Sequence, residues 1–326
     1  MKELVAGGLA FVAALAAVPL LVRYALGRNL LDVPNDRSSH EIPTPRLGGP
    51  AIMVATWIGF AVLRPAGAWP LLVAATLIGA VGLADDLRGL HFGTKAASQA
   101  LAAAGLIFFH PLQLLSEAPG VLKVAVFVLG VFWVVALSNA FNFMDGIDGI
   151  TGGIAIASAL FLYSLAGDAG AFLPALAGAA AGFLVWNISP ASTFCGDAGS
   201  YFLGFALAVA TLYAPVPAGE WSPLISIACV LVFTPYLFDT ACTLLRRLRA
   251  GKNIFSAHRE HIYQRITPST SLHRRTSNLY YGASVLAGFA GLLFSGGGAA
   301  SIAGAALALA ICCALAALPS FKVFAN

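Results

Sequence analysis

Apolar segments of roughly 17 to 25 residues recur along the whole chain and are separated by short polar connections. An α-helix needs about 20 apolar residues to cross the hydrocarbon core of a bilayer, so each segment is long enough for one crossing. The pattern predicts about eleven transmembrane helices, at residues 3–24, 48–63, 68–84, 95–111, 120–138, 150–166, 170–187, 199–214, 222–244, 277–295 and 298–318. The expected fold class is all-α, a polytopic transmembrane helical bundle that forms a single integral-membrane domain over residues 1–326.

The composition agrees with a protein surrounded by membrane lipids. Hydrophobic residues make up 59% of the chain and charged residues only 10%, which excludes an ordinary soluble domain. The 34 glycines favour close contacts between helices, since small residues let two backbones approach. Such faces would also permit a homodimer without requiring one, and no nucleic-acid partner is expected.

The positive charges predict the orientation in the membrane. Of the 18 Lys and Arg residues, only Lys2, Arg64 and Lys123 fall on the same side as the N-terminus when the segments are threaded alternately. Loops rich in Lys and Arg stay in the cytoplasm. We therefore expect the N-terminus outside, the C-terminus inside, and most acidic side chains, with any chemistry, at the cytoplasmic face.

One polar stretch interrupts the apolar pattern near the middle of the chain. Its polar side chains follow one another at intervals of three: Asn139, Asn142, Asp145 and Asp148. Carboxylates and amides beside a membrane are costly unless they bind something, and the glycines at 146 and 149 admit close backbone approach to a ligand. The alternative is a polar loop that only caps two helices.

Two further acidic motifs fall on the cytoplasmic side. Asp85 and Asp86 are adjacent like charges, which indicate a cation or a proton role, or else a solvated helix end. Asp197 stands between two glycines at the start of a helix. It could be a plain N-cap, or it could hold Mg²⁺ through one or two carboxylates and substrate phosphates.

Basic residues mark two of the inner loops. In the first, Arg37, His40 and Arg46 could meet phosphate, or form an ordinary positive loop. In the last, His258 and His261 alternate with arginines such as Arg259, a mixture suited to gripping phosphate groups. A metal site at the two histidines is the weaker reading, because no carboxylate or cysteine has fitting spacing.

Together the five clusters offer acids for a metal ion, amides for a base or sugar, and cations for phosphates. That inventory fits phosphoryl transfer, in which positioning and charge neutralisation do most of the catalysis. A polytopic transporter or lipid flippase is the rival from another class. Transporters place polar groups near the bilayer midplane on broken helices, whereas the acids here gather at predicted helix ends. A purely structural membrane protein would leave the clusters unexplained.

The chain resembles the polyprenyl-phosphate N-acetylhexosamine-1-phosphate transferases, glycosyltransferase family 4, which include the phospho-MurNAc-pentapeptide translocase. It looks most similar to the branch that initiates O-antigen, part of lipopolysaccharide, and other surface polysaccharides of the cell envelope. The matching motifs occur in family order: Pro45-Arg-Leu-Gly-Gly49, Asp85-Asp86, the stretch from Asn139 to Gly149, Gly196-Asp-x-Gly-Ser200 and Arg259-x-His261.

This resemblance implies a bacterial inner-membrane enzyme that moves a sugar 1-phosphate from a UDP-N-acetylhexosamine to undecaprenyl phosphate and releases UMP. It implies Mg²⁺, for which Mn²⁺ could substitute, with Asp197 and Asn142 as metal ligands. Asp85 and Asp86 match an acidic pair near the lipid phosphate, and Asp145, Asp148 and Asn187 match positions lining the nucleotide-sugar pocket. Arg259 and His261 match a loop that closes on pyrophosphate and sugar.

The residues themselves complete the expected site. We expect Arg46, Lys95, Asn139 and His258 to bind substrate, and Asp85, Asp86, Asp197 and His261 to be catalytic. Two mechanisms remain open: direct displacement by the acceptor phosphate, and a covalent intermediate on Asp85 or Asp86.

One motif departs from the family pattern. Many members carry His-Ile-His-His in the last loop, where this chain reads His261-Ile-Tyr263-Gln264. This form resembles the branch associated with 6-deoxy sugars. The donor is therefore expected to be UDP-GlcNAc or a 6-deoxy sugar such as UDP-FucNAc or UDP-QuiNAc.

Overall fold

The computed structural model describes residues 1–34, 40–64, 67–112, 114–115, 119–166, 170–214, 222–254, 256 and 258–320. Asp36, Arg37 and Lys322, which the orientation analysis placed on the inner side, lie outside the described residues.

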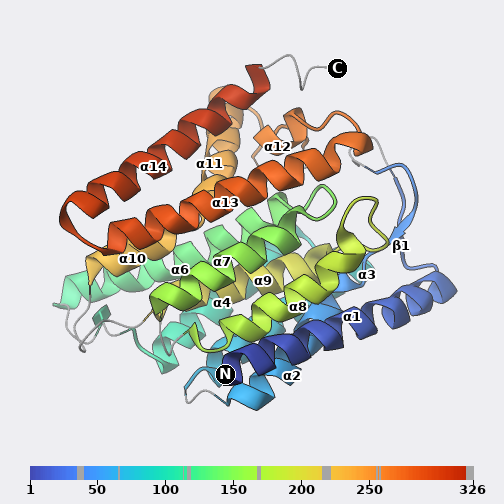
Figure 1. Ribbon diagram of the computed structural model, residues 1–326, viewed down its shortest axis with the longest axis horizontal. Coiled ribbons are helices and arrows are strands. Elements are labelled where there is room, and N and C mark those ends of the chain that lie inside the picture. Colours follow the sequence, from blue (N-terminus) through green and yellow to red (C-terminus); the bar gives the residue numbers. More distant parts are fainter. Residues whose placement is uncertain are drawn as a thin grey trace.

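Long helices run side by side and make up nearly all of the described structure (Figure 1). They are α1 (Lys2–Arg28), α2 (Gly48–Leu63), α3 (Trp69–Arg88), α4 (Phe92–Phe109), α6 (Gly120–Phe143), α7 (Ile150–Ala166), α8 (Leu173–Asn187), α9 (Gly196–Leu212), α10 (Pro223–Leu231), α11 (Thr234–Arg249), α13 (His273–Ser295) and α14 (Gly298–Ala317). The predicted all-α bundle is confirmed.

Short elements occupy the connections. Two-residue strands β1 (Leu31–Asp32) and β2 (Thr44–Pro45) pair antiparallel in the first loop. The one-turn helix α12 (Ile262–Arg265) lies in the last loop, and the 3₁₀ turns η3 (Thr270–Leu272) and η4 (Leu318–Ser320) flank α13 and follow α14.

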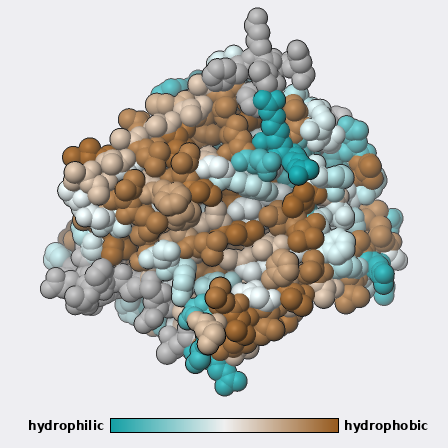
Figure 2. Space-filling model, viewed as in Figure 1, coloured by the Kyte–Doolittle hydropathy of each residue, from teal (hydrophilic) through white to brown (hydrophobic). Residues whose placement is uncertain are grey.

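Among the described residues, α1, α3, α4, α6 and the stretch Gly298–Ser320 are long and apolar enough to cross a membrane. The shorter helices α2, α7, α8 and α9 are also apolar. Apolar side chains cover much of the face shown in Figure 2, as expected of a surface that meets lipid tails. The protein is therefore a multi-pass membrane protein.

Helix α9 is the central element of the bundle. All its residues from Ala198 to Thr211 are buried, and it packs against α2, α3, α6 and α7. Glycines permit this packing: a Cβ on Gly49 would strike the backbone of Gly199, and one on Gly82 would strike the backbone of Asp197. The close approach brings the ends of α2 and α3 onto the start of α9.

The structure corrects one predicted helix and moves several ends. The segment predicted at 222–244 is two helices, α10 and α11, bent by 72° at residues 232–233, so a single straight helix there was wrong. Helix α3 continues to Arg88, so Asp85 and Asp86 lie in its last turn and not in a loop. A pattern of apolar residues does not reveal such end turns, because their side chains are polar. These side chains bond to other parts of the bundle.

Candidate active site

The two adjacent aspartates at the end of α3 have different partners. Both oxygens of Asp86 accept hydrogen bonds from the start of α9, at 2.9 Å from the Asp197 N–H and 3.0 Å from the Ala198 N–H. Asp85 instead lies 2.5 Å from the Lys95 ammonium. Asp86 therefore caps α9 from another helix, where the positive end of the helix dipole favours a carboxylate.

Lys95, in the first turn of α4, bridges two carboxylates. Its Nζ lies 2.5 Å from Asp85 and 3.2 Å from Asp197, and only 15% of its side chain is exposed. The same Nζ also lies over the Tyr201 ring, 5.7 Å from the ring centre. The residue predicted to bind phosphate thus sits between two predicted catalytic residues.

Asn142 completes this cluster from the end of α6. Its Nδ2 donates to Asp197 Oδ1 at 2.9 Å and to the Ser200 hydroxyl at 3.1 Å. Four helices, α3, α4, α6 and α9, thus each contribute one member of a group that we call the acidic cluster: Asp85, Lys95, Asn142 and Asp197.

The acidic cluster has the donor chemistry that Mg²⁺ prefers. Mg²⁺ takes oxygen ligands and is usually bound by one or two carboxylates that substrate phosphates and water complete. Within the described residues, no group of three or more His, Cys, Asp or Glu side chains forms a closed metal cage. Asn142 faces Asp197 through its Nδ2, so the two residues would hold an ion with the amide turned to present its Oδ1 and with a diphosphate substrate supplying further oxygens.

Asn139 lies one turn earlier on α6 and faces a different partner. Its Nδ2 donates to Gln99 Oε1 of α4 at 2.6 Å and to the Val135 carbonyl at 2.8 Å. Gln99 is fully buried one turn after Lys95. Sequence reasoning missed Gln99, although a polar residue four positions from a site lysine in an alanine-rich helix was a usable signal.

Asp148 links three connections of the bundle. Its Oδ2 accepts from the Ala191 N–H at 3.2 Å, and its Oδ1 lies 3.3 Å from Nδ1 of His273, the first residue of α13. Burial alone would raise the pKa of Asp148, but the contact with His273 and the Ala191 bond lower it below its usual value. Asp148 is thus held as a carboxylate, and His273 is a contact that sequence reasoning missed.

Asn187, at the end of α8, binds the same turn. Its Oδ1 accepts from the Gly149 N–H at 3.0 Å, and its Nδ2 donates to the Thr193 carbonyl at 2.8 Å. Both polar ends of the buried amide are therefore used to join the Gly149 turn to the loop before α9. The structure brings Asn187 and Asp148 together, as the predicted site requires.

Asp145 is a buried acid of this region whose pKa lies well above the usual value. Burial raises its pKa to about 7, the negative charge of Asp86 adds to the effect, and a hydrogen bond with Thr151 opposes it. A buried carboxyl group that titrates near neutral pH is typical of functional sites.

The last loop is fastened beside the end of α6. His261 is 2% exposed, its ring stacks on His258 at 5.0 Å, and Arg259 between them is partly buried. Burial, together with the charges of His261 and Arg247, lowers the pKa of His258 to about 4. The Tyr263 hydroxyl donates to the Phe143 carbonyl at 3.0 Å, next to Asn142.

The deepest contact of this loop is with Asp239 on α11. This fully buried carboxylate lies 3.1 Å from His261 Nδ1 and accepts from the backbone N–H groups of Ile262 and Tyr263. Asp239 was visible in the sequence as a lone acid in an apolar helix, but its partner was not.

Arg46 is held at the edge of the site. Its guanidinium lies 2.5 Å from Asp32 of β1, and the side chain is 39% exposed. The preceding Pro45 carbonyl accepts from the Phe194 N–H at 2.8 Å, which joins the first loop to the loop before α9. The first loop and the Asp148–Gly149 turn are therefore both bonded to the loop that leads into α9.

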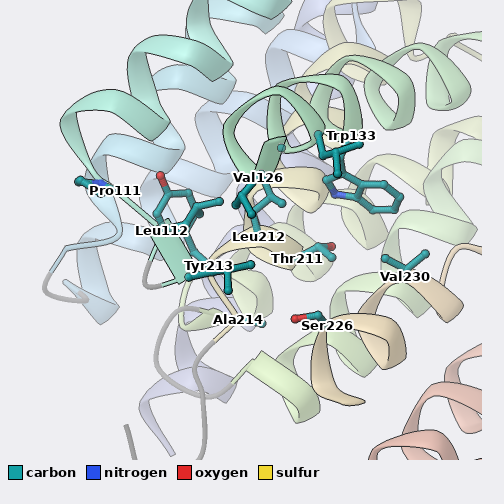
Figure 3. Close-up of a pocket in the computed structure, with 13 residues that line it drawn as sticks. Pro111, Leu112, Val126, Trp133, Thr211, Leu212, Tyr213, Ala214, Ser226 and Val230 are labelled. Carbon is teal, nitrogen blue, oxygen red and sulfur yellow. The ribbon is translucent and has the colours of Figure 1, made fainter. Parts of the chain in front are cut away.

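A cavity of about 620 Å³ lies at the other end of the bundle, between the segment that follows α4, helix α6, the end of α9 and α10 (Figure 3). Its lining at Thr211 is fourteen residues from Asp197, or about 21 Å along α9. The Thr211 hydroxyl donates to Leu207 and the Ser226 hydroxyl to Ser222, within their own helices. These walls suit hydrocarbon and not a nucleotide.

The chain is similar to known membrane transferases over most of its length. It is 32% identical to decaprenyl-phosphate N-acetylglucosaminephosphotransferase of Mycolicibacterium smegmatis, across 85% of this chain and 79% of that protein. It is 27% identical to the probable undecaprenyl-phosphate N-acetylglucosaminyl 1-phosphate transferase of Bacillus subtilis, across 83% and 80%. It is 26% identical to phospho-N-acetylmuramoyl-pentapeptide-transferase of Listeria welshimeri, across 73% and 80%. Residues 68–214 match the family described as glycosyl transferase family 4.

Proposed function

Because the chain belongs to glycosyl transferase family 4 and is a phosphoglycosyltransferase, we propose that it transfers an N-acetylhexosamine 1-phosphate from a UDP-sugar to undecaprenyl phosphate, releasing UMP. The observation that carries the proposal is the acidic cluster, to which four helices contribute one residue each. The side chains that we propose for binding metal, phosphate and nucleotide lie around it. Phosphoryl transfer needs such groups for positioning and for charge neutralisation.

The proposed chemistry is direct displacement. An oxygen of the acceptor phosphate attacks the β-phosphorus of the donor, and a new P–O bond forms. The bond from that phosphorus to the oxygen bridging the α-phosphate breaks, and UMP leaves with the electron pair. A phosphate monoester has a second pKa near 6, so at pH 7 the nucleophile is largely dianionic and needs little help from a base.

The residues of this chain then have positioning roles. Lys95 holds a phosphate oxygen with its ammonium group, and Asp85 positions the acceptor or takes a residual proton. Arg259 and His261 hold donor phosphates from the last loop. Mg²⁺ or Mn²⁺, held by Asp197 and Asn142, would neutralise charge on the diphosphate when bound.

The contacts of Asp86 support direct displacement over a covalent intermediate. Both of its oxygens accept backbone N–H groups of α9, so attack by either would uncap that helix. Asp85 is the remaining candidate nucleophile, and its pairing with Lys95 lowers its reactivity.

For the donor we propose UDP-GlcNAc first, because the similar proteins of M. smegmatis and B. subtilis carry that sugar in their names. A 6-deoxy donor such as UDP-FucNAc or UDP-QuiNAc follows from the Tyr263-Gln264 departure. In this chain Tyr263 and Gln264 both bond within the protein, to Phe143 and to the His261 N–H. The product would start O-antigen or another surface polysaccharide.

We further propose that the protein lies in the bacterial inner membrane with the acidic cluster facing the cytoplasm. In this arrangement the eleven predicted segments are spans, the bent pair α10 and α11 forms one of them, and the N-terminus is outside. A homodimer remains a prediction from small-residue faces.

The test is UMP release by purified protein in detergent with undecaprenyl phosphate, Mg²⁺ and a panel of UDP-N-acetyl sugars. We expect metal-dependent release with one donor, and loss by about 10²-fold or more in Asp197→Ala. Gly105→Ala, in open space on α4, is the matched folded control. No release with any donor from a folded protein would overturn the proposal and favour a transporter.

A further inference from the structure

We infer that Asp239 is a positioning residue for His261, and that the two form a carboxylate–imidazole dyad which aims the other ring nitrogen at the substrate phosphates. This inference rests on the proposed function. It concerns a part of the chain that lies beyond residues 68–214, which match the family model.

The first observation is that hydrogen-bond donors surround both oxygens of the Asp239 carboxylate. It is fully buried, and five donors approach its two oxygens. Oδ1 lies 3.1 Å from His261 Nδ1, 2.8 Å from the Ile262 N–H and 3.3 Å from the Thr243 hydroxyl. Oδ2 lies 3.0 Å from the Tyr263 N–H and 2.6 Å from the Tyr280 hydroxyl. A buried carboxylate of this kind is satisfied without a metal or water.

The second observation is what these contacts do to the imidazole. A carboxylate at Nδ1 keeps the proton on that nitrogen, so Nε2 is the atom available to a ligand. The same carboxylate binds the next two backbone N–H groups, which fixes the loop as well as the ring. A protonated imidazole held in this way donates a charged hydrogen bond to a phosphate oxygen.

The third observation is where the ring lies. The His261 ring centre is 6.1 Å from that of Phe143, which is next to Asn142 of the acidic cluster. The Tyr263 hydroxyl bonds the Phe143 carbonyl and so holds this side of the loop against α6. The titratable side chains in contact with the ring are Asp239 of α11 and His258 and Tyr263 of its own loop. Tyr280 of α13 contacts the same carboxylate and not the ring.

The break between α10 and α11 explains why an acid can be there. Helix α11 restarts at Thr234 after a bend of 72° and is directed toward the last loop. Asp239, two residues after the first turn of α11, therefore meets the loop and α13 together.

The experiment is the pH dependence of kcat/KM for UMP release in Asp239→Asn, with His261→Gln and Thr240→Val for comparison. In the wild type we expect activity to fall at high pH as His261 loses its proton. The negative charge of Asp239 favours the protonated form of His261. Asp239→Asn removes this charge, so in the variant the fall in activity should begin about one pH unit lower. Thr240, next to Asp239, makes no hydrogen bond within the described residues, so Thr240→Val should match the wild type.

Tyr280→Phe provides a variant that should fold even if Asp239→Asn does not. It removes one donor to Oδ2 and leaves the charge in place, so the fall should move slightly to higher pH. The inference is overturned if the fall persists in His261→Gln, or if neither Asp239→Asn nor Tyr280→Phe moves it. Activity of the wild type in the same assay keeps this result separate from failure of the proposed function.

Discussion

At the scale of the residue, the site is built from charged groups whose partners come from distant parts of the chain. Lys95 and Asp197 are 102 positions apart and lie 3.2 Å from each other. Asp239 and Tyr280 are 41 positions apart and lie at 2.6 Å. Each such contact offsets the cost of removing a charge from water, which would otherwise be several kcal/mol. The arrangement therefore depends on every member remaining charged and in place.

Lys95 gives the first prediction at this scale. Lys95→Gln removes the cation between Asp85 and Asp197, and we expect kcat/KM for UMP release to fall by about 10² to 10³-fold. Lys123→Gln, at the exposed start of α6, should keep wild-type activity. A Lys95→Gln enzyme within about threefold of the wild type would contradict the assigned role.

Asp145 gives a prediction about stability and pH. Because its pKa is raised to about 7, this group favours the folded state at low pH, and its contribution is lost as pH rises from about 4 to 7. Asp145→Asn cannot ionise, so its melting temperature relative to wild type should increase between pH 5 and pH 8. Thermal melts of both proteins in detergent at several pH values would measure this. A difference that stays constant with pH would count against it.

At the scale of the element, helix α9 organises the site because four other helices, α2, α3, α4 and α6, contact its first turn. The Cβ-free surfaces of Gly49 and Gly82 let α2 and α3 touch its backbone. Asp86 then caps α9, and Asp197 in the same turn faces Lys95 and Asn142. The glycines therefore contribute to the site by allowing the helices to pack closely, and not through a reactive side chain.

Gly82→Ala should show this directly. The added methyl would strike the Asp197 and Ala198 backbone, so α3 and α9 must separate. We expect activity to drop by at least about tenfold and the melting temperature to fall, since overpacking costs about 1–3 kcal/mol. Gly105→Ala meets nothing within 4 Å and should leave both unchanged. Equal behaviour of the two variants would show that this helix contact does not position the acids.

At the scale of the whole molecule, the helices bring their polar ends to one side of the bundle. The acidic cluster, the first loop and the last loop lie together, whereas the apolar cavity lies at the far end of α9 (Figure 3). This polarity matches the distribution of Lys and Arg along the chain. Under the proposed function, the polar side of the bundle receives the nucleotide substrate, and the apolar opposite end suits lipid.

Cysteine labelling would test the proposed orientation. In a background without the natural cysteines, Lys2→Cys should react with a membrane-impermeant maleimide in intact cells. Ser269→Cys, exposed in the last loop, should react only after the cells are permeabilised. The reverse pattern would place the acidic cluster outside and rule out a cytoplasmic nucleotide donor.

The sequence by itself determined the helical class, the positions of the apolar segments and the types of residue in the site. These follow from local properties: run length, alternation with polar loops, and motifs of neighbouring residues. Asp85, Asn142 and Asp197 were all identified this way. The three glycines at 296–298 likewise mark the turn between α13 and α14, where Gly297 and Gly298 have positive φ.

Only the tertiary structure decided how those residues divide their roles. The adjacent Asp85 and Asp86 look equivalent in the chain, yet one faces Lys95 and the other caps α9. The roles of three further residues depend on partners from distant parts of the chain: Asp239, Gln99 and His273. Hydrophobic periodicity records which face of a helix is apolar, but the direction of a buried polar side chain depends on which helix packs beside it. That choice is made by the packing of the whole bundle, including the 72° bend that places Asp239 against His261.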